Sequence, residues 1–492
     1  MPGIEGLLLP FQHPETILFV ALGVFIGIYA GALPGISISM TIAILISFTF
    51  PWPFWSAFGM MIGVYIGGIY GGSRAAILLN IPGVPAAVAS TFDGYPMAQK
   101  GEAGQAMGLA TSLCVFGTTF GVIILALFSP LIANIALKFT PMHFFWLGLM
   151  GILIISSLGG SNILKSLLCG VFGILLGCVG IDPFFAEARL TFGSEMLLSG
   201  FNFVVVMIAL FGLAESLVQI RNNIFPVKQK IDRIIPEWKT IKKHLPLTLR
   251  SGVIGVLIGA LPGTGGDIAS LMAYEQAKRT VKNPTRPFGE GAVEGLVAAE
   301  AASSACIGGT MIPMLTLGIP GDAVTAILIG ALMIHGLRPG PLLMVDQPEF
   351  FYVWLACLFF GVIFLWFFGM QGIRLFAKIV EIPKGMLVPI IIVFTFIGCF
   401  SIQNNFIDVY VMLIIGLLGY FMKMYGFEVA PTILGLILAP IIEENWRRSM
   451  QIMHNHISEF LVYTFTDTIS LILVFILIVN AKLTRPKADG VA

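Results

Sequence analysis

The sequence contains little charge. Only 11% of its 492 residues are charged and 57% are hydrophobic, whereas soluble globular chains carry roughly 25% charged and about 45–50% apolar residues. The net charge is +1 and no long basic stretch with interleaved aromatics occurs, which argues against a nucleic-acid surface. The sequence has no GxxxxGK[ST] phosphate-binding loop, so we do not expect the chain to hydrolyse ATP. These absences predict an all-α polytopic membrane protein.

Metal-binding and signal-peptide patterns are also absent. No CxxC pair and no histidine at metal-ligand spacing occurs, so we expect the cysteines to be packing residues, with no metal site and no cofactor. No Lys or Arg precedes Arg74, so the positively charged region of a cleaved signal peptide is missing and the first hydrophobic segment is expected to stay in the mature protein. The six cysteines are Cys114, Cys169, Cys178, Cys306, Cys357 and Cys399.

Long apolar runs make up most of the chain, from Thr16 to Leu217 and again from Ser251 to Val479. Since a spanning helix needs about 20 mostly apolar residues, the chain has room for roughly 10–12 transmembrane helices, including broken or re-entrant segments. Residues 221–250 carry eight basic side chains, which predicts a cytoplasmic linker. We expect a first membrane repeat over residues 1–220, this basic linker over 221–250, and a second repeat with extra C-terminal helices over 251–492.

Two short strings recur in the same order in both halves. GALPG occupies residues 31–35 and 259–263, and IPG occupies residues 81–83 and 319–321, each time after a Gly-Gly pair. This ordered recurrence indicates an internal duplication. Basic residues flank the second GALPG on both sides but are absent around the first, so we expect two re-entrant hairpins of opposite orientation and therefore two inverted repeats. A straight span from Ser251 to Ala277 is the alternative.

The Pro-Gly strings predict helix breaks that line a binding site. Irregular backbone at membrane depth survives only when it is buried in protein or lines a wet cavity. Half-helices that start after such breaks point their N–H groups and positive dipole ends at one place, which suits an anion. The alternative is that each Pro-Gly is a packing kink. The expected substrate-binding residues are Pro34, Gly35, Ser37, Ser39, Asn80, Pro82, Gly83, Pro262, Gly263, Thr264, Gly265, Pro320 and Gly321.

Ionisable residues inside apolar segments are the other candidates, because they are expensive there and usually functional. Arg74 is the only charge between Glu15 and Asp93. Its guanidinium is expected to bind a substrate carboxylate through two hydrogen bonds, unless it extends to a lipid headgroup. Asp267 and Asp322 follow the breaks of the second half and are expected to bind Na⁺ or a proton, unless they cap half-helices. Glu294 and Glu300 complete the expected ion-coupling residues.

Four stretches of the sequence resemble one known family. They are GALPGISISMTIAILISFTF, GGSRAAILLNIPGVPAAVASTFDGYPMAQKGEAGQAMGLA, GALPGTGGDIASLMAYEQAKR and FGEGAVEGLVAAEAASSACIGGTMIPMLTLGIPGDAVTAILIGALMIHGLRPGP, and they cover most of residues 20–345. They are similar to the large membrane subunit of the tripartite tricarboxylate transporters, the TctA family. The resemblance implies a permease of the bacterial inner (cytoplasmic) membrane that imports carboxylates with a cation gradient. It also implies two partners, a small four-helix membrane subunit and a periplasmic substrate-binding protein.

The resemblance extends to individual motif positions but includes departures. Where the family usually has two Asn residues after Glu300-Ala-Ala, this chain has Ser303 and Ser304. Arg74, Asp267 and Asp322 stand where small or neutral residues are expected. These changes bear on the substrate and the coupling ion. The matching motif positions are Gly31, Pro34, Gly35, Asn80, Pro82, Gly83, Asp93, Gly94, Pro262, Gly263, Gly265, Glu294, Glu300, Pro320 and Gly321.

The sequence therefore predicts the permease subunit of a binding-protein-dependent secondary transporter for small organic anions, which are di- or tricarboxylates. It is not expected to be an enzyme, and its coupling cation is Na⁺ or H⁺. Two rivals remain at this stage. One is an intramembrane enzyme that uses Asp267 and Asp322 as a carboxylate pair, and the other is a non-transporting channel or scaffold subunit.

Overall fold

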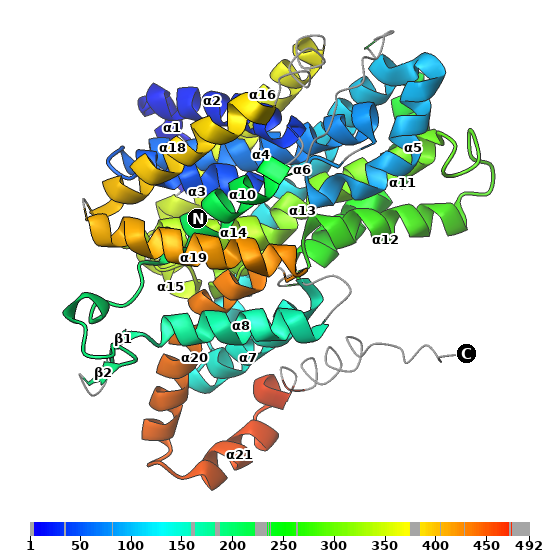
Figure 1. Cartoon of the computed structure of the whole chain (residues 1–492). Coiled ribbons are helices and arrows are strands. Elements are labelled where there is room, and N and C mark those ends of the chain that lie inside the picture. The colour runs from blue at the N-terminus through cyan, green and yellow to red at the C-terminus, as the bar shows by residue number, and fades with distance from the viewer. Residues whose placement is uncertain are drawn as a thin grey trace, which may run out of the picture.

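In the residues that the computed structural model describes, all regular elements are helices apart from one short β-hairpin (Figure 1). Strands β1 (Gly180–Ile181) and β2 (Ala188–Arg189) pair antiparallel, with Gly180 opposite Arg189. The structure describes residues 4–33, 36–80, 82–158, 163–182, 187–221, 234, 236, 238–261, 264–373, 384–403, 405–427, 429–471 and 474.

In the described residues, both halves of the chain consist mainly of helices. The first half contains η1 (Ile4–Leu7), α1 (Leu9–Gln12), α2 (Pro14–Ala32), α3 (Ile38–Thr49), α4 (Phe54–Leu79), η2 (Pro85–Ala87), α5 (Val88–Met97), η3 (Ala98–Glu102), α6 (Ala103–Ala136), α7 (Pro141–Leu158), α8 (Ile163–Gly177), η4 (Glu195–Leu197), α9 (Phe203–Met207), η5 (Ile208–Leu213) and α10 (Ala214–Arg221). The second half contains α11 (Trp238–Gly259), α12 (Gly265–Thr280), α13 (Val293–Leu317), α14 (Ala323–Ile334), α15 (Pro341–Asp346), α16 (Pro348–Gln371), α18 (Lys384–Gln403), α19 (Phe406–Met424), α20 (Ala430–Ile452) and α21 (Ile457–Thr466).

Six helical stretches of the described chain are long and apolar enough to cross a membrane. Other apolar helices are shorter, and two of them, α3 and α14, have 12 residues each. They are too short to span a bilayer alone, because a span takes about 20 residues. The all-helical, membrane-crossing class is thus confirmed, while the total of 10–12 spans remains a prediction. The six stretches are Pro14–Ala32, Phe54–Leu79, Pro85–Ala136, Val293–Leu317, Pro348–Gln371 and Phe406–Met424.

Glycines set the distance between α2 and α4. A Cβ built on any of six glycines at i, i+4 spacing would lie 2.1–2.4 Å from a carbonyl oxygen of the facing helix. No side chain fits there, so the two backbones touch directly, as at small-xxx-small contacts between membrane helices. We call this the α2–α4 glycine contact. Its members are Gly23, Gly27 and Gly31 on α2 and Gly63, Gly67 and Gly71 on α4.

The two halves of the chain are packed into each other. Helix α13 of the second half lies against α6 of the first, and α16 lies against α2 and α6. At Gly121 of α6 and Gly308 of α13 the two backbones again come too close for a Cβ. Figure 1 shows α4 and α13 in the middle of the molecule, with α2 and α16 to one side and α12 to the other. The repeats predicted for residues 1–220 and 251–492 therefore share one core.

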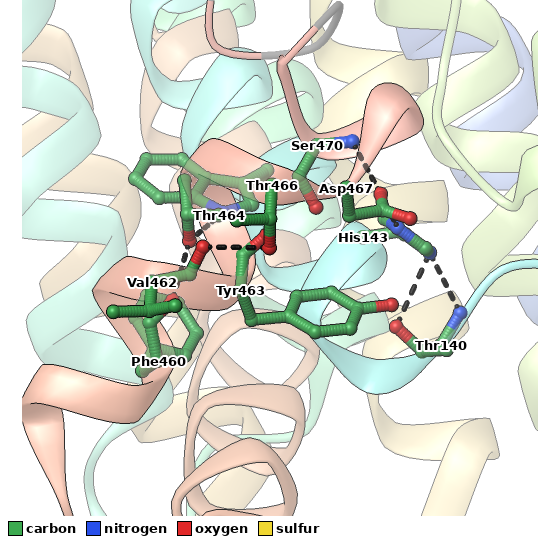
Figure 2. Close-up of polar contacts among 10 residues, drawn as sticks. Thr140, His143, Phe460, Val462, Tyr463, Thr464, Thr466, Asp467 and Ser470 are labelled. Carbon is green, nitrogen blue, oxygen red and sulfur yellow. Dashed lines mark hydrogen bonds and ion pairs between the residues drawn. The ribbon is translucent and has the colours of Figure 1, made fainter.

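Helices α7, α8, α20 and α21 form a group at one side of this core (Figure 1). Helix α20 packs against both α7 and α8. Beyond α21, Asp467 accepts a hydrogen bond from His143 Nε2 of α7 at 2.7 Å, and the Thr140 N–H donates to Nδ1 of the same ring at 2.8 Å (Figure 2). Because a backbone N–H only donates, Nδ1 must be the acceptor, which leaves the ring proton on Nε2. This contact joins the end of α21 to α7.

Candidate functional site

The first pair of breaks separates short helices from the longer ones before them. Helix α2 ends at Ala32 and α3 begins at Ile38, where the Ser37 hydroxyl caps the new helix by accepting from the Met40 N–H at 3.0 Å. In the second half α11 ends at Gly259, and α12 begins at Gly265 with φ +68°. Residues 251–277 are thus divided between two helices and do not form one continuous helix. Pro34, Gly35, Pro262 and Gly263 lie outside the described residues.

The second pair of breaks has the same form in both halves. Asn80 follows the end of α4 and Gly318 follows the end of α13, and both residues are left-handed, with φ 57° and 71°. The glycine of the IPG string that follows packs closely on a neighbouring backbone in each half. A Cβ on Gly83 would lie 2.0 Å from the Gly31 carbonyl oxygen, and one on Gly321 would lie 2.5 Å from the Thr310 Cα. Glycine is required at both positions because the chain approaches another backbone there.

All four breaks contribute residues to the wall of one cavity of about 420 Å³. The first residues of α3, α12 and α14 line it, so three helix N-termini face the same space. Seven of the predicted site residues lie on its wall, and they come from both halves of the chain. They are Ser37, Ser39, Pro82, Gly83, Gly265, Asp267 and Asp322.

Asp322 caps α14 at the cavity wall. Its Oδ1 accepts from the Thr325 N–H at 2.8 Å, and the Thr325 hydroxyl in turn accepts from the Asp322 N–H at 2.8 Å. Its Oδ2 accepts from the Tyr65 hydroxyl of α4 at 2.5 Å. The capping alternative is therefore correct for Asp322, although the same carboxylate also faces the cavity. Tyr65 connects it to the first half.

Asp267 lies in the first turn of α12, next to Asp322. A Cβ built on Gly265 would lie 2.8 Å from Asp267 Oδ1 and 3.5 Å from the Asp322 Cβ. Both acidic side chains therefore crowd around this glycine. Two carboxylates that share one cavity favour a bound cation or proton, because like charges close together disfavour full ionisation.

A charged pair completes the cavity wall. Lys423 of α19 donates a hydrogen bond to Glu215 Oε2 of α10, and both residues line the cavity. Sequence reasoning missed this pair, and it also missed Tyr65 and Gly266. A signal was present, since Lys423 and Glu215 are single charges at the ends of apolar runs, the same criterion that selected Arg74.

Arg74 does not line this cavity and is completely buried. Its guanidinium donates to the Tyr70 hydroxyl and, at 2.5 Å, to the Gly369 carbonyl oxygen of α16. The Tyr70 ring lies 4.3 Å from the guanidinium carbon. Burial excludes the alternative in which Arg74 extends to a lipid headgroup. These contacts join α4 to α16.

Glu294 and Glu300 also lie away from the cavity. Glu300 of α13 is fully buried and accepts from the Ser90 hydroxyl at 2.5 Å and the Cys114 thiol at 3.1 Å. Glu294 accepts from the Thr285 N–H at 3.0 Å, and its other oxygen lies 3.1 Å from His244 Nε2. Asn80, Thr264, Pro320 and Gly321 belong to the breaks but do not line the cavity.

The loop before α13 is fixed to the first half of the chain. Asp93 Oδ1 of α5 accepts from the N–H groups of Gly289, Gly291 and Ala292 at 2.8–2.9 Å. The Arg286 guanidinium binds both oxygens of Glu102 at 2.6 and 2.7 Å. Hydrogen bonds to this carboxylate raise the pKa of Arg286. Asp93, a motif residue without a predicted role, thus anchors the second half to the first.

A second, larger cavity of about 620 Å³ lies between residues 195–203 and helices α14, α19 and α20. It is lined by none of the residues that the sequence predicts for the site, and by no helix break of the duplicated strings. The smaller cavity is therefore the candidate site. In the described part of the chain no group of three or more His, Cys, Asp or Glu residues is arranged to hold a metal ion.

Comparison with known proteins finds one matching family and two related sequences. A model of the tripartite tricarboxylate transporter TctA family matches residues 17–434. An uncharacterized 52.8 kDa protein from the TAR-I ttuC' 3' region of Agrobacterium vitis is 38% identical over 384 residues, 77% of this chain and 76% of that protein. An uncharacterized protein from the TAR-II ttuC' 3' region of the same organism is 38% identical over 238 residues, 48% of this chain and 98% of that protein. No solved structure matches significantly.

Proposed function

Because the chain belongs to the TctA family of tripartite tricarboxylate transporters, we propose that it imports small organic anions, di- or tricarboxylates, with a gradient of Na⁺ or protons. Membership makes it a multi-pass membrane protein and the permease component of a system with other subunits, a transport component rather than an enzyme. The substrate and the coupling ion are our proposals.

The observation that carries this proposal is the composition of the 420 Å³ cavity. Three helix N-termini face it, and their N–H groups and dipoles favour an anion. Its described wall also has three carboxylates, Glu215, Asp267 and Asp322, and one basic side chain, Lys423. An anion that enters alone would therefore meet an excess of negative charge. A cation taken up with it would offset this charge, which is the physical basis for coupled transport.

We further propose that the two halves are inverted repeats and that this cavity is the transport site between them. The matched breaks after α2 and α11, and after α4 and α13, support this arrangement. The partners would be a small four-helix membrane subunit and a periplasmic substrate-binding protein, in the bacterial inner membrane. Substrate would then reach the cavity from the binding protein.

The test is uptake into proteoliposomes that contain this chain and its small membrane subunit, with the binding protein outside. A series of radiolabelled mono-, di- and tricarboxylates is offered with an imposed Na⁺ gradient, an imposed proton gradient, or none. We expect gradient-dependent uptake of a di- or tricarboxylate. Asp322→Asn should reduce uptake by about tenfold or more by removing a charge, while Asn still caps α14.

Asp346→Asn is the matched control, because Asp346 is exposed and does not line the cavity. It should transport as the wild type does. Carboxylate uptake at the same rate with and without a gradient would contradict coupled transport. A failure of every carboxylate to accumulate, with all three components present, would contradict the substrate class.

A further inference from the structure

The Lys423–Glu215 pair lies on the wall of the 420 Å³ cavity. Lys423 lies near the end of α19 and Glu215 near the start of α10, so the pair joins two helices across the cavity wall. Both side chains are about one-fifth exposed, at 18% and 22%. They are therefore partly desolvated yet accessible from the cavity that they line.

Lys423 is the only basic side chain on the described wall of the cavity. Helix N-termini provide partial positive charge, and a full counter-charge beside them strengthens the binding of an organic anion in a partly desolvated site. An ammonium group has three N–H donors, and it forms charge-assisted hydrogen bonds with carboxylates. The first half of the chain provides no arginine here, since Arg74 is directed at Tyr70 and Gly369.

We propose that Lys423 binds a carboxylate of the transported anion and that Glu215 occupies this place when substrate is absent. This inference rests on the proposed function. A partly desolvated lysine without a counter-ion would be costly, so an internal carboxylate stabilises the empty site. An incoming carboxylate replaces Glu215 with a group of the same charge and chemistry. Substrate and Glu215 therefore compete for the same ammonium group.

If substrate and Glu215 compete for Lys423, substitutions of Lys423 and Glu215 should change the half-saturating concentration for uptake in opposite directions. Lys423→Gln removes the counter-charge and should raise the half-saturating concentration for uptake of labelled citrate, used as the tricarboxylate probe, by about tenfold. Glu215→Gln removes the competitor and should lower that concentration. A pair that only holds α10 against α19 predicts impaired transport in both variants. Measurements are made in the reconstituted three-component system and normalised to folded protein.

Matched controls come from an exposed pair outside the cavity. Arg279 and Glu275 of α12 are 78% and 54% exposed, with 3.9 Å between Arg279 Nε and Glu275 Oε2. Arg279→Gln and Glu275→Gln should leave the half-saturating concentration unchanged. Lys423→Arg, which keeps the charge, should lie between the wild type and Lys423→Gln.

The double variant Lys423→Gln with Glu215→Gln keeps the test decisive if a single variant folds poorly, because it leaves no unpaired charge in the partly desolvated wall. We expect it to keep the raised half-saturating concentration of Lys423→Gln. Wild-type values in the double variant, or impairment in both single variants, would overturn the inference. Absence of gradient-driven uptake by the wild type would instead count against the proposed function itself.

Discussion

Arg74 shows how a single buried charge connects elements that are distant in the sequence. It is fully buried on α4, and its hydrogen bond to Gly369 reaches α16. Tyr70, which accepts from Arg74, also bonds to Thr111 of α6. Helices α4, α6 and α16 are therefore joined through Arg74 and Tyr70. Because charged hydrogen bonds contribute about 1.5–3 kcal/mol each, this contact is a strong candidate for a stabilising role.

We therefore expect Arg74→Gln to lower the thermal stability and the yield of folded protein, while the half-saturating concentration of the surviving protein stays near the wild-type value. Arg338→Gln is the control, since Arg338 is exposed. Thermal unfolding in detergent and carboxylate uptake provide the two measurements. A raised half-saturating concentration at normal stability would instead support the carboxylate contact that the sequence predicts.

Asp322 and Lys423 show which features of a site residue can be predicted from the sequence. Local hydrogen bonds can be predicted, whereas contacts between distant segments cannot. Asp322 stands three residues before Thr325, a spacing typical of a helix N-cap, and the cap is present. Its partner Tyr65 is 257 residues away in the sequence, so no local pattern indicates that contact. Lys423 and Glu215 are 208 residues apart, and only the folded chain brings them together. Charge inside an apolar run identified candidates, but tertiary packing decided which of them line the cavity.

Helices α11 and α12 form a hairpin whose two ends lie on the same side of the molecule. His244, near the start of α11, contacts Glu294, and Glu294 accepts from Thr285, which follows α12. The two helices also pack against each other. The chain therefore turns back at the second GALPG, as the flanking basic residues predict.

The hairpin predicts that Lys243 and Lys282, which are both exposed, face the same compartment. Single cysteines at these positions should both resist an impermeant thiol reagent applied to the periplasmic side, and both should react after permeabilisation. The natural cysteines give little background, because five are buried and Cys178 is only partly exposed. Labelling of one position without permeabilisation but not the other would contradict the hairpin.

At the scale of elements, the Pro-Gly strings were the most informative part of the sequence. They located the ends of α2, α4, α11 and α13, because proline and glycine stop helices for reasons that act within a few residues. They did not distinguish the residues of a break that line the cavity from those that only support it. Gly83 lines the cavity whereas Gly321 packs on Thr310 and does not line it, although each is the glycine of an IPG string.

At the scale of the whole molecule, the halves are one packed unit. Asp93 binds the loop before α13, Tyr65 binds Asp322, and α6 lies against α13. The sequence indicated the duplication but gave no sign of this packing, because each contact joins segments about 200 or more residues apart, a separation at which local patterns carry no information. A cavity whose wall comes from both halves changes shape when one half moves relative to the other.

The α2–α4 glycine contact limits which movements are available. Glycines of each helix face carbonyl groups of the other with no room for a Cβ, so a sliding displacement along the helix axes would drive neighbouring side chains into the backbone. We therefore expect no shear between α2 and α4, which should travel as a single rigid body. A disulfide between Val20→Cys and Gly59→Cys, whose positions touch, should leave carboxylate uptake intact. Reversible loss of uptake on oxidation would instead show that the two helices slide. If α2 and α4 do not slide, the movements of transport must occur at contacts between helices that are made by side chains rather than by glycine backbones.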